Sequence, residues 1–112
     1  MAKKTSEKGE YERLRALFAD MDADRLALID GLLWQAARLR VRADDLWRDL
    51  RRNGETERFV QGRDAEPYDR ERPASRTYTA TCKLYQQVIR QLCEICPGVS
   101  ERDALDEFRA DG

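Results

Sequence analysis

The sequence from residue 24 to residue 53 reads DRLALIDGLLWQAARLRVRADDLWRDLRRN. Apolar side chains recur in it at alternating steps of three and four over three heptads, which is the period of one face of an α-helix. They are Ile29, Leu32, Ala36, Leu39, Ala43, Leu46 and Leu50. The pattern predicts one long helix over residues 24–53 that ends at Gly54. Arg40 interrupts the apolar stripe, so its side chain is expected either to reach solvent or to pair with a specific carboxylate.

A second apolar strip lies on the opposite side of this helix. Trp34, Ala37 and Val41 follow one another at steps of three and four residues. One partner helix cannot cover both strips, so the first helix of the chain or another subunit is expected to pack on the second one.

The partner of the long helix is predicted over residues 74–96. Pro73 suits the first turn of a helix, and the sequence that follows repeats the helical period. Its apolar residues are Tyr78, Cys82, Tyr85, Ile89, Leu92 and Cys96. Leu84, Val88 and Ile95 lie outside this seam and indicate a second contact surface.

The remaining segments complete a small helical domain. The sequence predicts a flexible arm over residues 1–9, a helix over 10–21, a loop over 54–73 and a last helix over 100–109. A short β-hairpin around residues 58–61 is the alternative within the loop. We therefore expect an all-α fold in which residues 10–112 form a long antiparallel helical hairpin with a short helix at each end, and which oligomerises.

Composition excludes several classes of function. The chain has 112 residues, with 22 acidic and 21 basic side chains and no histidine. A net charge of -1 argues against a uniformly basic nucleic-acid binder. Without histidine, a phosphate-binding loop or a nucleophile motif, we expect no enzyme and no cofactor.

The three cysteines and the lack of long apolar runs indicate a compartment. Cys82, Cys93 and Cys96 are too few for a disulfide framework, and packing is their expected role, with no metal site. The polar first ten residues lack the apolar core of a signal peptide, and no stretch has the roughly 20 apolar residues of a membrane span. A cytoplasmic protein without membrane contact is expected.

Basic residues concentrate between residues 31 and 52. Six arginines there face three aspartates, which gives a net charge of +3. Such a stretch serves either as a phosphate-binding surface, sensitive to salt, or as a solvated helix with ion pairs along it. The sequence leaves both interpretations open.

The order of these features resembles the small terminase subunits of tailed phages and prophages. The likeness covers about residues 10–96: a long helix ending in Arg51-Arg52-Asn53-Gly54, a polar loop with Phe59-Val60-Gln61-Gly62, and Arg72-Pro73 opening a helix that carries Tyr78, Lys83, Tyr85 and Gln91-Leu92. The resemblance implies a non-catalytic DNA-packaging factor of the bacterial host cytoplasm. Such a factor assembles into a ring, recognises the packaging site on double-stranded phage DNA, and recruits and regulates the large terminase subunit, an ATPase and nuclease.

The resemblance also suggests which residues carry this function. The DNA-contact candidates are Lys3, Lys4, Lys8, Arg38, Arg42, Arg48, Arg51 and Arg52. The candidates for the interface between copies are Trp34, Ala37, Val41, Leu84, Val88 and Ile95. The acidic segment 99–112 would be free for the large subunit. The roughly 22 residues before the long helix are too few for an N-terminal helix-turn-helix, so DNA would be held by basic patches repeated around the assembly.

Two alternatives belong to other classes. The first is a small helical-hairpin adaptor or regulator that binds a protein partner and no DNA. The second is a redox or metal protein that uses the three cysteines.

Overall fold

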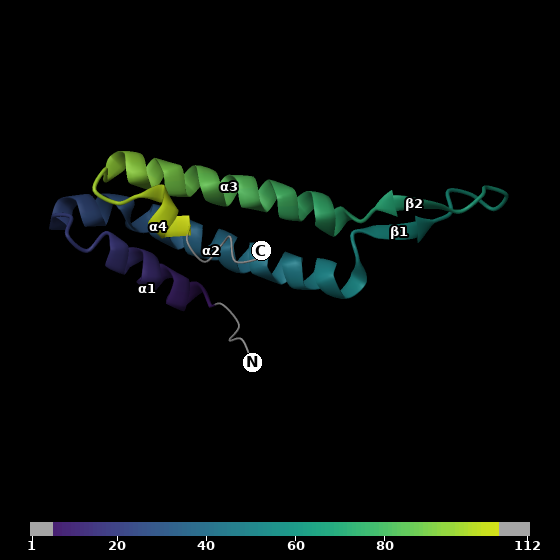
Figure 1. Cartoon of the computed structure of the whole chain (residues 1–112), viewed down its shortest axis with the longest axis horizontal. Helices are drawn as coiled ribbons and strands as arrows, with labels where there is room; N and C mark the ends of the chain where they lie inside the picture. Colours follow the sequence, from purple (N-terminus) through teal and green to yellow (C-terminus); the bar gives the residue numbers. More distant parts are fainter. Residues whose placement is uncertain (1–5, 106–112) are drawn as a thin grey trace.

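The computed structural model describes residues 6–105, which form four helices and one β-hairpin. The elements are α1 (Glu7–Leu17), α2 (Ala23–Asn53), β1 (Thr56–Phe59), β2 (Tyr68–Glu71), α3 (Pro73–Ile95) and α4 (Glu101–Leu105). Figure 1 shows α2 and α3 lying side by side along the molecule, with α1 and α4 against one end and the β-hairpin at the other. The prediction of a mostly helical fold, in which a long helical hairpin is preceded and followed in the chain by a short helix, is confirmed.

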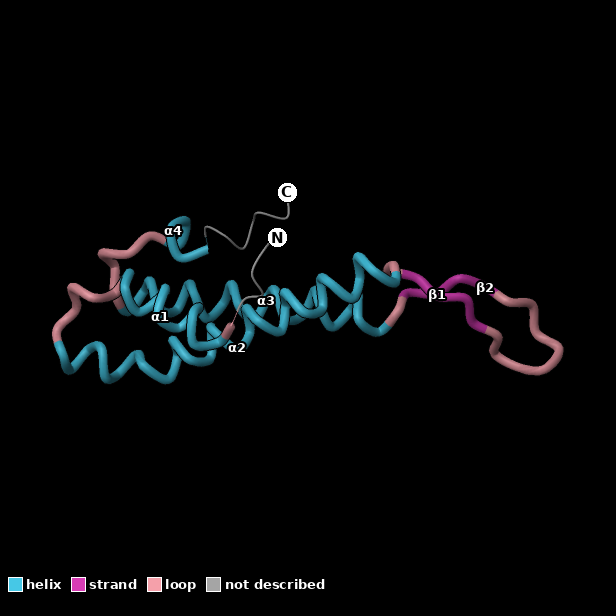
Figure 2. Tube along the Cα trace, turned by 90° about the horizontal axis from the view of Figure 1, so that it is seen from below, coloured by secondary structure: helices cyan, strands magenta, loops and turns pink. Residues whose placement is uncertain are grey.

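The molecule is markedly elongated, as the view in Figure 2 also shows. It measures 65 × 30 × 21 Å, and its radius of gyration is 17.8 Å. A compact domain of this length has a radius of gyration of about 13 Å. The chain therefore exposes more surface than a globular domain of its size.

Local capping sets the ends of α2. The Asp22 carboxylate accepts a hydrogen bond from the backbone N–H of Arg25 (2.8 Å), which satisfies one of the free donors of the first turn. At the other end Gly54 adopts φ 85° and donates its N–H to the carbonyl of Leu50. Only glycine adopts such a backbone conformation without strain, which is why the helix ends here.

The first helix begins earlier than predicted. The Ser6 hydroxyl caps it by accepting from the N–H of Gly9 (3.0 Å), so residues 7–9 are helical and the predicted arm is wrong for these three. Residues 1–5 of that arm lie outside the described part of the chain. The helix ends at Leu17, and residues 18–20 form a turn. The last helix, predicted over residues 100–109, begins at Glu101 and is helical to Leu105, the last residue that the structure describes.

The predicted loop over residues 54–73 contains two antiparallel strands, so the loop prediction is wrong for those strands. Thr56 is opposite Glu71 and Phe59 is opposite Tyr68, and the turn spans residues 60–67 rather than 58–61. Polar cross-strand pairs stabilise the strands, with Arg70 bound to Glu57 (2.7 Å) and placed over the ring of Phe59 (3.6 Å). Since these pairs are charged, the strands show no alternating apolar pattern.

The apolar core lies at the end of the hairpin that α1 and α4 cover. Leu14 from α1, Ile29 and Leu33 from α2, Ile89 from α3 and Ala104 from α4 are all fully buried there. The short helices therefore share one core with the hairpin.

A charged cluster is buried beside this core. The Glu10 carboxylate of α1 is 3% exposed and accepts from Arg13 (2.8 Å) and from the hydroxyl of Tyr85 (3.2 Å). Arg40 lies 4.0 Å from the same carboxylate and 3.3 Å from Asp44. Burial raises the pKa of Tyr85 to about 12, so its hydroxyl remains a donor. Of the two outcomes predicted for Arg40, the structure shows the second: its side chain is buried near carboxylates and does not reach solvent.

The substitution Glu10→Gln tests how much this cluster contributes to stability. It removes the negative charge that faces two guanidinium groups, and loss of one partner in a buried ion pair costs about 3 kcal/mol. We expect the free energy of unfolding to fall by about this amount in urea titrations followed by circular dichroism. Glu12→Gln, on the exposed side of α1, is the control and should change stability by less than about 0.5 kcal/mol. Equal effects of the two variants would contradict a stabilising role for the cluster.

Candidate functional site

The arginines of α2 that were predicted to contact DNA are all exposed, but they do not form one patch. Arg38 and Arg42 are one turn apart on the same side of the helix, and neither makes an ion pair with any residue between 6 and 105. Arg51 lies about 140° around the helix from Arg38. A single DNA surface on α2 therefore cannot include both ends of the predicted set.

Ion pairing and helix-end electrostatics account for the rest of this set. Arg48 bonds to Asp45 at 2.7 Å, one turn earlier in the helix. Arg51 and Arg52 occupy the last turn of α2, where cations interact favourably with the helix dipole. Lys8 is exposed on α1, while Lys3 and Lys4 lie outside the described residues. Of the described candidates on α2, Arg38 and Arg42 are therefore best placed for an external anion.

The surroundings of Arg38 and Arg42 are mixed in charge. Both side chains line a shallow cavity of about 500 Å³ together with Val41 of α2 and Glu7 of α1. Asp45 and Asp49 also line it. These carboxylates would oppose a phosphate placed in the cavity, so the exposed rim is the more favourable position for one.

Helix α1 covers the apolar strip of α2 that was predicted to bind a second copy. Trp34 stacks on Tyr11 with ring centroids 4.0 Å apart, and the Tyr11 hydroxyl donates to Asp30. Ala37 is completely buried within the chain. Ala37 is therefore not available to another subunit, and Trp34 already has an aromatic partner. Trp34 and Val41 are both half-buried, and Val41 lies beside Glu7 of α1.

The predicted interface residues of α3 are only partly covered within the chain. Leu84 is 50% exposed, and Ile95 is half-buried, so both remain accessible. Val88 is 7% exposed and belongs to the core, which corrects its assignment to an interface.

The exposed apolar surface of α2 does not lie on the strip that was predicted to bind a second copy. Leu28 is 73% exposed, and Leu39 lines a groove between α2 and α3 together with Leu84. Leu28 and Leu39 are eleven residues apart, which is close to three full turns, so they share a side of α2. We call Leu28, Leu39 and Leu84 the open face of the hairpin. The sequence analysis placed Leu39 in the central seam, and Leu39 is half-buried against the core. It did not single out Leu28.

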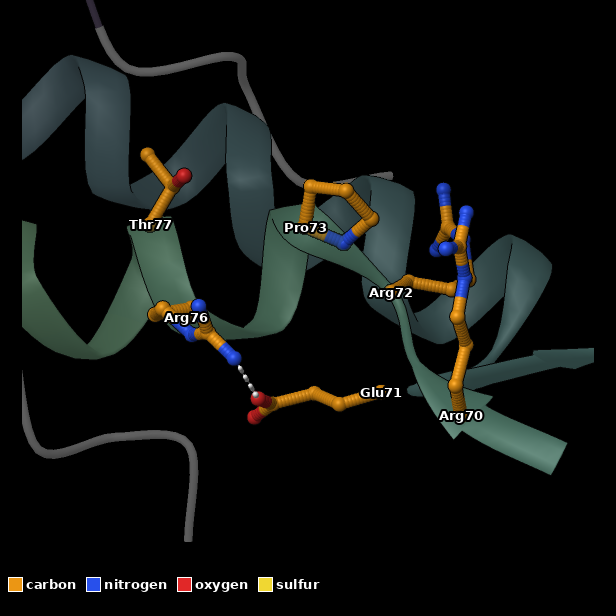
Figure 3. Close-up of a pocket in the computed structure, with 6 residues that line it drawn as sticks. All are labelled: Arg70, Glu71, Arg72, Pro73, Arg76 and Thr77. Carbon is orange, nitrogen blue, oxygen red and sulfur yellow. Dashed lines mark ion pairs between the residues drawn. The ribbon is translucent and has the colours of Figure 1, made fainter. Parts of the chain in front are cut away.

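Three arginines form the joint between the β-hairpin and the helices. Arg70, Arg72 and Arg76 line a cavity of about 380 Å³ with Glu71, Pro73 and Thr77, as Figure 3 shows. Each has a carboxylate partner: Arg70 binds Glu57, Arg72 binds Asp49 (3.0 Å), and Arg76 lies 3.6 Å from Glu71. Arg72 also donates to the carbonyl of Gly54 (2.7 Å). This joint links the end of α2 to the start of α3, and sequence reasoning missed it.

The cysteines are reduced and poorly reactive. Cys96 is buried, and Cys82 and Cys93 are half-buried. Burial raises the pKa of all three thiols, that of Cys93 to about 11, so little thiolate is present at neutral pH. Within residues 6–105 no group of three or more cysteine, aspartate or glutamate side chains is arranged to hold a metal ion.

Comparison with known proteins adds no assignment. No protein-family model, no curated protein and no solved structure matches the chain. None of the described helices has the length and apolar character needed to cross a membrane.

The joint predicts a pH-dependent contribution to stability. Hydrogen bonds from Asn53 and Arg72 lower the pKa of Asp49. The ionised Asp49 therefore stabilises the folded state at pH values above the ordinary aspartate pKa, and this contribution is lost as the pH falls through the lowered value. In Arg72→Gln the pKa of Asp49 should rise toward its ordinary value, as measured by carboxyl NMR titration. Arg58→Gln, which removes an exposed cross-strand pair at 3.4 Å, is the control. An unchanged Asp49 pKa in Arg72→Gln would contradict the joint.

Proposed function

We propose that this protein is a non-catalytic DNA-packaging factor similar to the small terminase subunits of tailed phages. Copies associate through the helical hairpin, the assembly holds double-stranded phage DNA at the packaging site, and it recruits and regulates the large terminase subunit. It acts in the cytoplasm of the bacterial host.

The observation that carries this proposal is the open face. Leu28 is 73% exposed and Leu84 is 50% exposed, and the half-buried Leu39 lines the groove beside Leu84. The molecule is also elongated for its length. Exposed apolar surface of this kind marks protein–protein contacts, and long helices associate well because they bury continuous area. Ile95 of α3 extends the contact.

The exposed arginines support the DNA-binding part of the proposal. Arg38 and Arg42 present guanidinium groups without ion-pair partners in the described chain, and Arg51, Arg52 and Lys8 are also exposed. Single contacts of this kind to phosphate are weak and sensitive to salt. Repeated around an assembly, they bind DNA with an avidity that one copy lacks.

The acidic C-terminal region is the proposed contact for the large subunit. Residues 99–112 contain five acidic and two basic side chains, a net charge of -3. This charge would repel DNA, so the segment suits a protein partner better than a nucleic acid.

The function is tested by light scattering at low and moderate salt, with and without duplex DNA. We expect a discrete assembly of several copies whose mass rises with DNA at low salt and rises less at moderate salt. A monomer or dimer that is indifferent to DNA would contradict the proposal. That result would instead favour a small helical adaptor for a protein partner.

The role of the open face is tested by Leu84→Asp. An unpaired charge on an apolar contact opposes association, so the mass from light scattering should fall to that of a smaller species while helicity by circular dichroism is retained. Val60→Asp is the matched control, because Val60 is 49% exposed and lies in the turn of the β-hairpin. An unchanged mass in Leu84→Asp, or an equal loss in Val60→Asp, would contradict assembly through this face.

A further inference from the structure

Helix α3 contains a long stretch without acidic side chains. Between Pro73 and Cys93 there is no aspartate or glutamate, and the only basic residues are Arg76, Lys83 and Arg90. In a chain with 22 acidic residues among 112, 21 consecutive residues without one make this helix unusual. α2, in contrast, alternates its arginines with aspartates.

The three cations of α3 lie on one side of the helix. They are seven residues apart, which is about two turns, with a drift of only about 20° per step. Arg76 is 85% exposed, Arg90 is 63% exposed, and Lys83 is exposed as well. We call these three residues the basic stripe of α3. It extends over about 21 Å, since each residue of a helix rises 1.5 Å.

The residues beside the stripe suit a phosphate backbone. Gln86 and Gln87 are exposed between Lys83 and Arg90, and Thr79 is exposed between Arg76 and Lys83. Amide and hydroxyl side chains of this kind, together with lysine and arginine, make most of the contacts to DNA phosphates. No carboxylate from α3 itself intervenes before Glu94.

The cations of the stripe are only weakly engaged. The pair Arg76–Glu71 measures 3.6 Å and the pair Arg90–Glu101 measures 3.7 Å, both exposed, and no ion pair of Lys83 occurs within residues 6–105. Exposed pairs of this kind contribute about 0–1 kcal/mol. Exchange of these carboxylates for phosphate oxygens therefore costs little.

The groove between the two long helices joins the stripe to α2 and to the open face. It measures about 360 Å³ and is lined by Arg42 and Arg76 on its two sides, with Thr77 and Thr81 between them. Leu39 and Leu84 of the open face line the same groove. The stripe thus runs along the border of the surface through which copies are proposed to associate.

We propose that the basic stripe of α3, with Arg42 across the groove, is the surface that contacts the phosphates of duplex DNA. This inference rests on the proposed function and locates its DNA contact on α3 rather than on α2 alone. A stripe of 21 Å covers about six base pairs at 3.4 Å each and reads no base, so the contact is independent of sequence.

The test removes the three charges together. The variant Arg76→Gln, Lys83→Gln, Arg90→Gln is compared with Arg15→Gln, Arg25→Gln, Arg63→Gln, a control that loses the same charge from exposed positions on α1, α2 and the β-hairpin turn. Binding to a short labelled DNA duplex of arbitrary sequence is measured by fluorescence anisotropy between about 50 and 200 mM salt. Circular dichroism and light scattering on both triple variants check that their fold and assembly match those of the wild-type protein.

The slope of the logarithm of affinity against the logarithm of salt is the decisive readout. We expect it to decrease in magnitude by about 0.9 for each lost phosphate contact, so by about 2.7 per bound copy in the α3 variant, and to change little in the control. A loss of affinity in the α3 variant beyond that of the control supports the inference.

Three other outcomes overturn it. Equal losses in the two variants would mean that net charge matters and its location does not. Unchanged binding by the α3 variant, with loss in Arg38→Gln, Arg51→Gln, Arg52→Gln, would place the contact on α2 and leave the proposed function intact. If the wild-type protein assembles but binds no duplex at low salt, the proposed function fails together with the inference.

Discussion

The structure depends on one constraint, which is that α2 carries more apolar surface than any single helix can cover. It has 31 residues and is therefore about 46 Å long. α3 packs along one side of it, and α1 packs on a second side through the stacking of Tyr11 on Trp34. On the third side Leu28 is 73% exposed, while Leu39 is half-buried against the core and also lines the groove beside α3. The open face is thus a direct result of the length and pattern of this helix.

The same constraint explains why a charged cluster lies in the core. Where α1 crosses α2 and α3, Arg40 interrupts the apolar stripe and lies near two carboxylates, Asp44 of α2 at 3.3 Å and Glu10 of α1 at 4.0 Å. Tyr85 of α3 and Arg13 of α1 bond to the Glu10 carboxylate. Arg13 also donates to the carbonyl of Ala104 in α4 (2.7 Å), so one carboxylate ties the four helices together. A buried polar network of this kind forms its hydrogen bonds only when the helices that contribute to it are correctly placed. The cluster therefore helps to fix how α1 and α4 pack on the hairpin.

The sequence predicted the elements whose pattern is local. The three-four spacing predicted α2 and α3, and Gly54 marked the end of α2. The place of Arg40 on an apolar stripe indicated either a route to solvent or a carboxylate partner. The sequence could not identify Glu10 as that partner, because thirty residues and a turn separate the two. Nor could it decide between α1 and another subunit as the cover of Trp34, since both present an apolar helix face. The β-hairpin was predicted only as the alternative to a loop, because charged pairs such as Glu57 with Arg70 stabilise it and leave no alternating apolar pattern.

The candidate site was harder to predict because some arginines of this chain form ion pairs within it, while others are exposed without such a partner among residues 6–105. All but four of the 21 basic residues are arginine. Arg48 pairs with Asp45 at 2.7 Å on the surface of α2, and Arg72 binds Asp49 at 3.0 Å in the joint between α2 and α3. Counting arginines therefore pointed to α2, where the density is highest. The absence of acidic residues from most of α3 is a second signal, because the carboxylates near Arg76 and Arg90 come from neighbouring segments and lie at 3.6 and 3.7 Å. It is the basis of the proposed contact on α3.

The two proposed surfaces also depend on each other energetically. Three exposed cations per copy give weak binding at physiological salt, because the released counterions are the main driving force. Association through the open face would place several such stripes on one body, and each further contact would then be made at a high effective concentration. DNA affinity would thus rise and fall with assembly, although no residue of the open face touches the nucleic acid. A chain of this size can therefore combine a small apolar contact and a small basic stripe into a surface that neither provides alone.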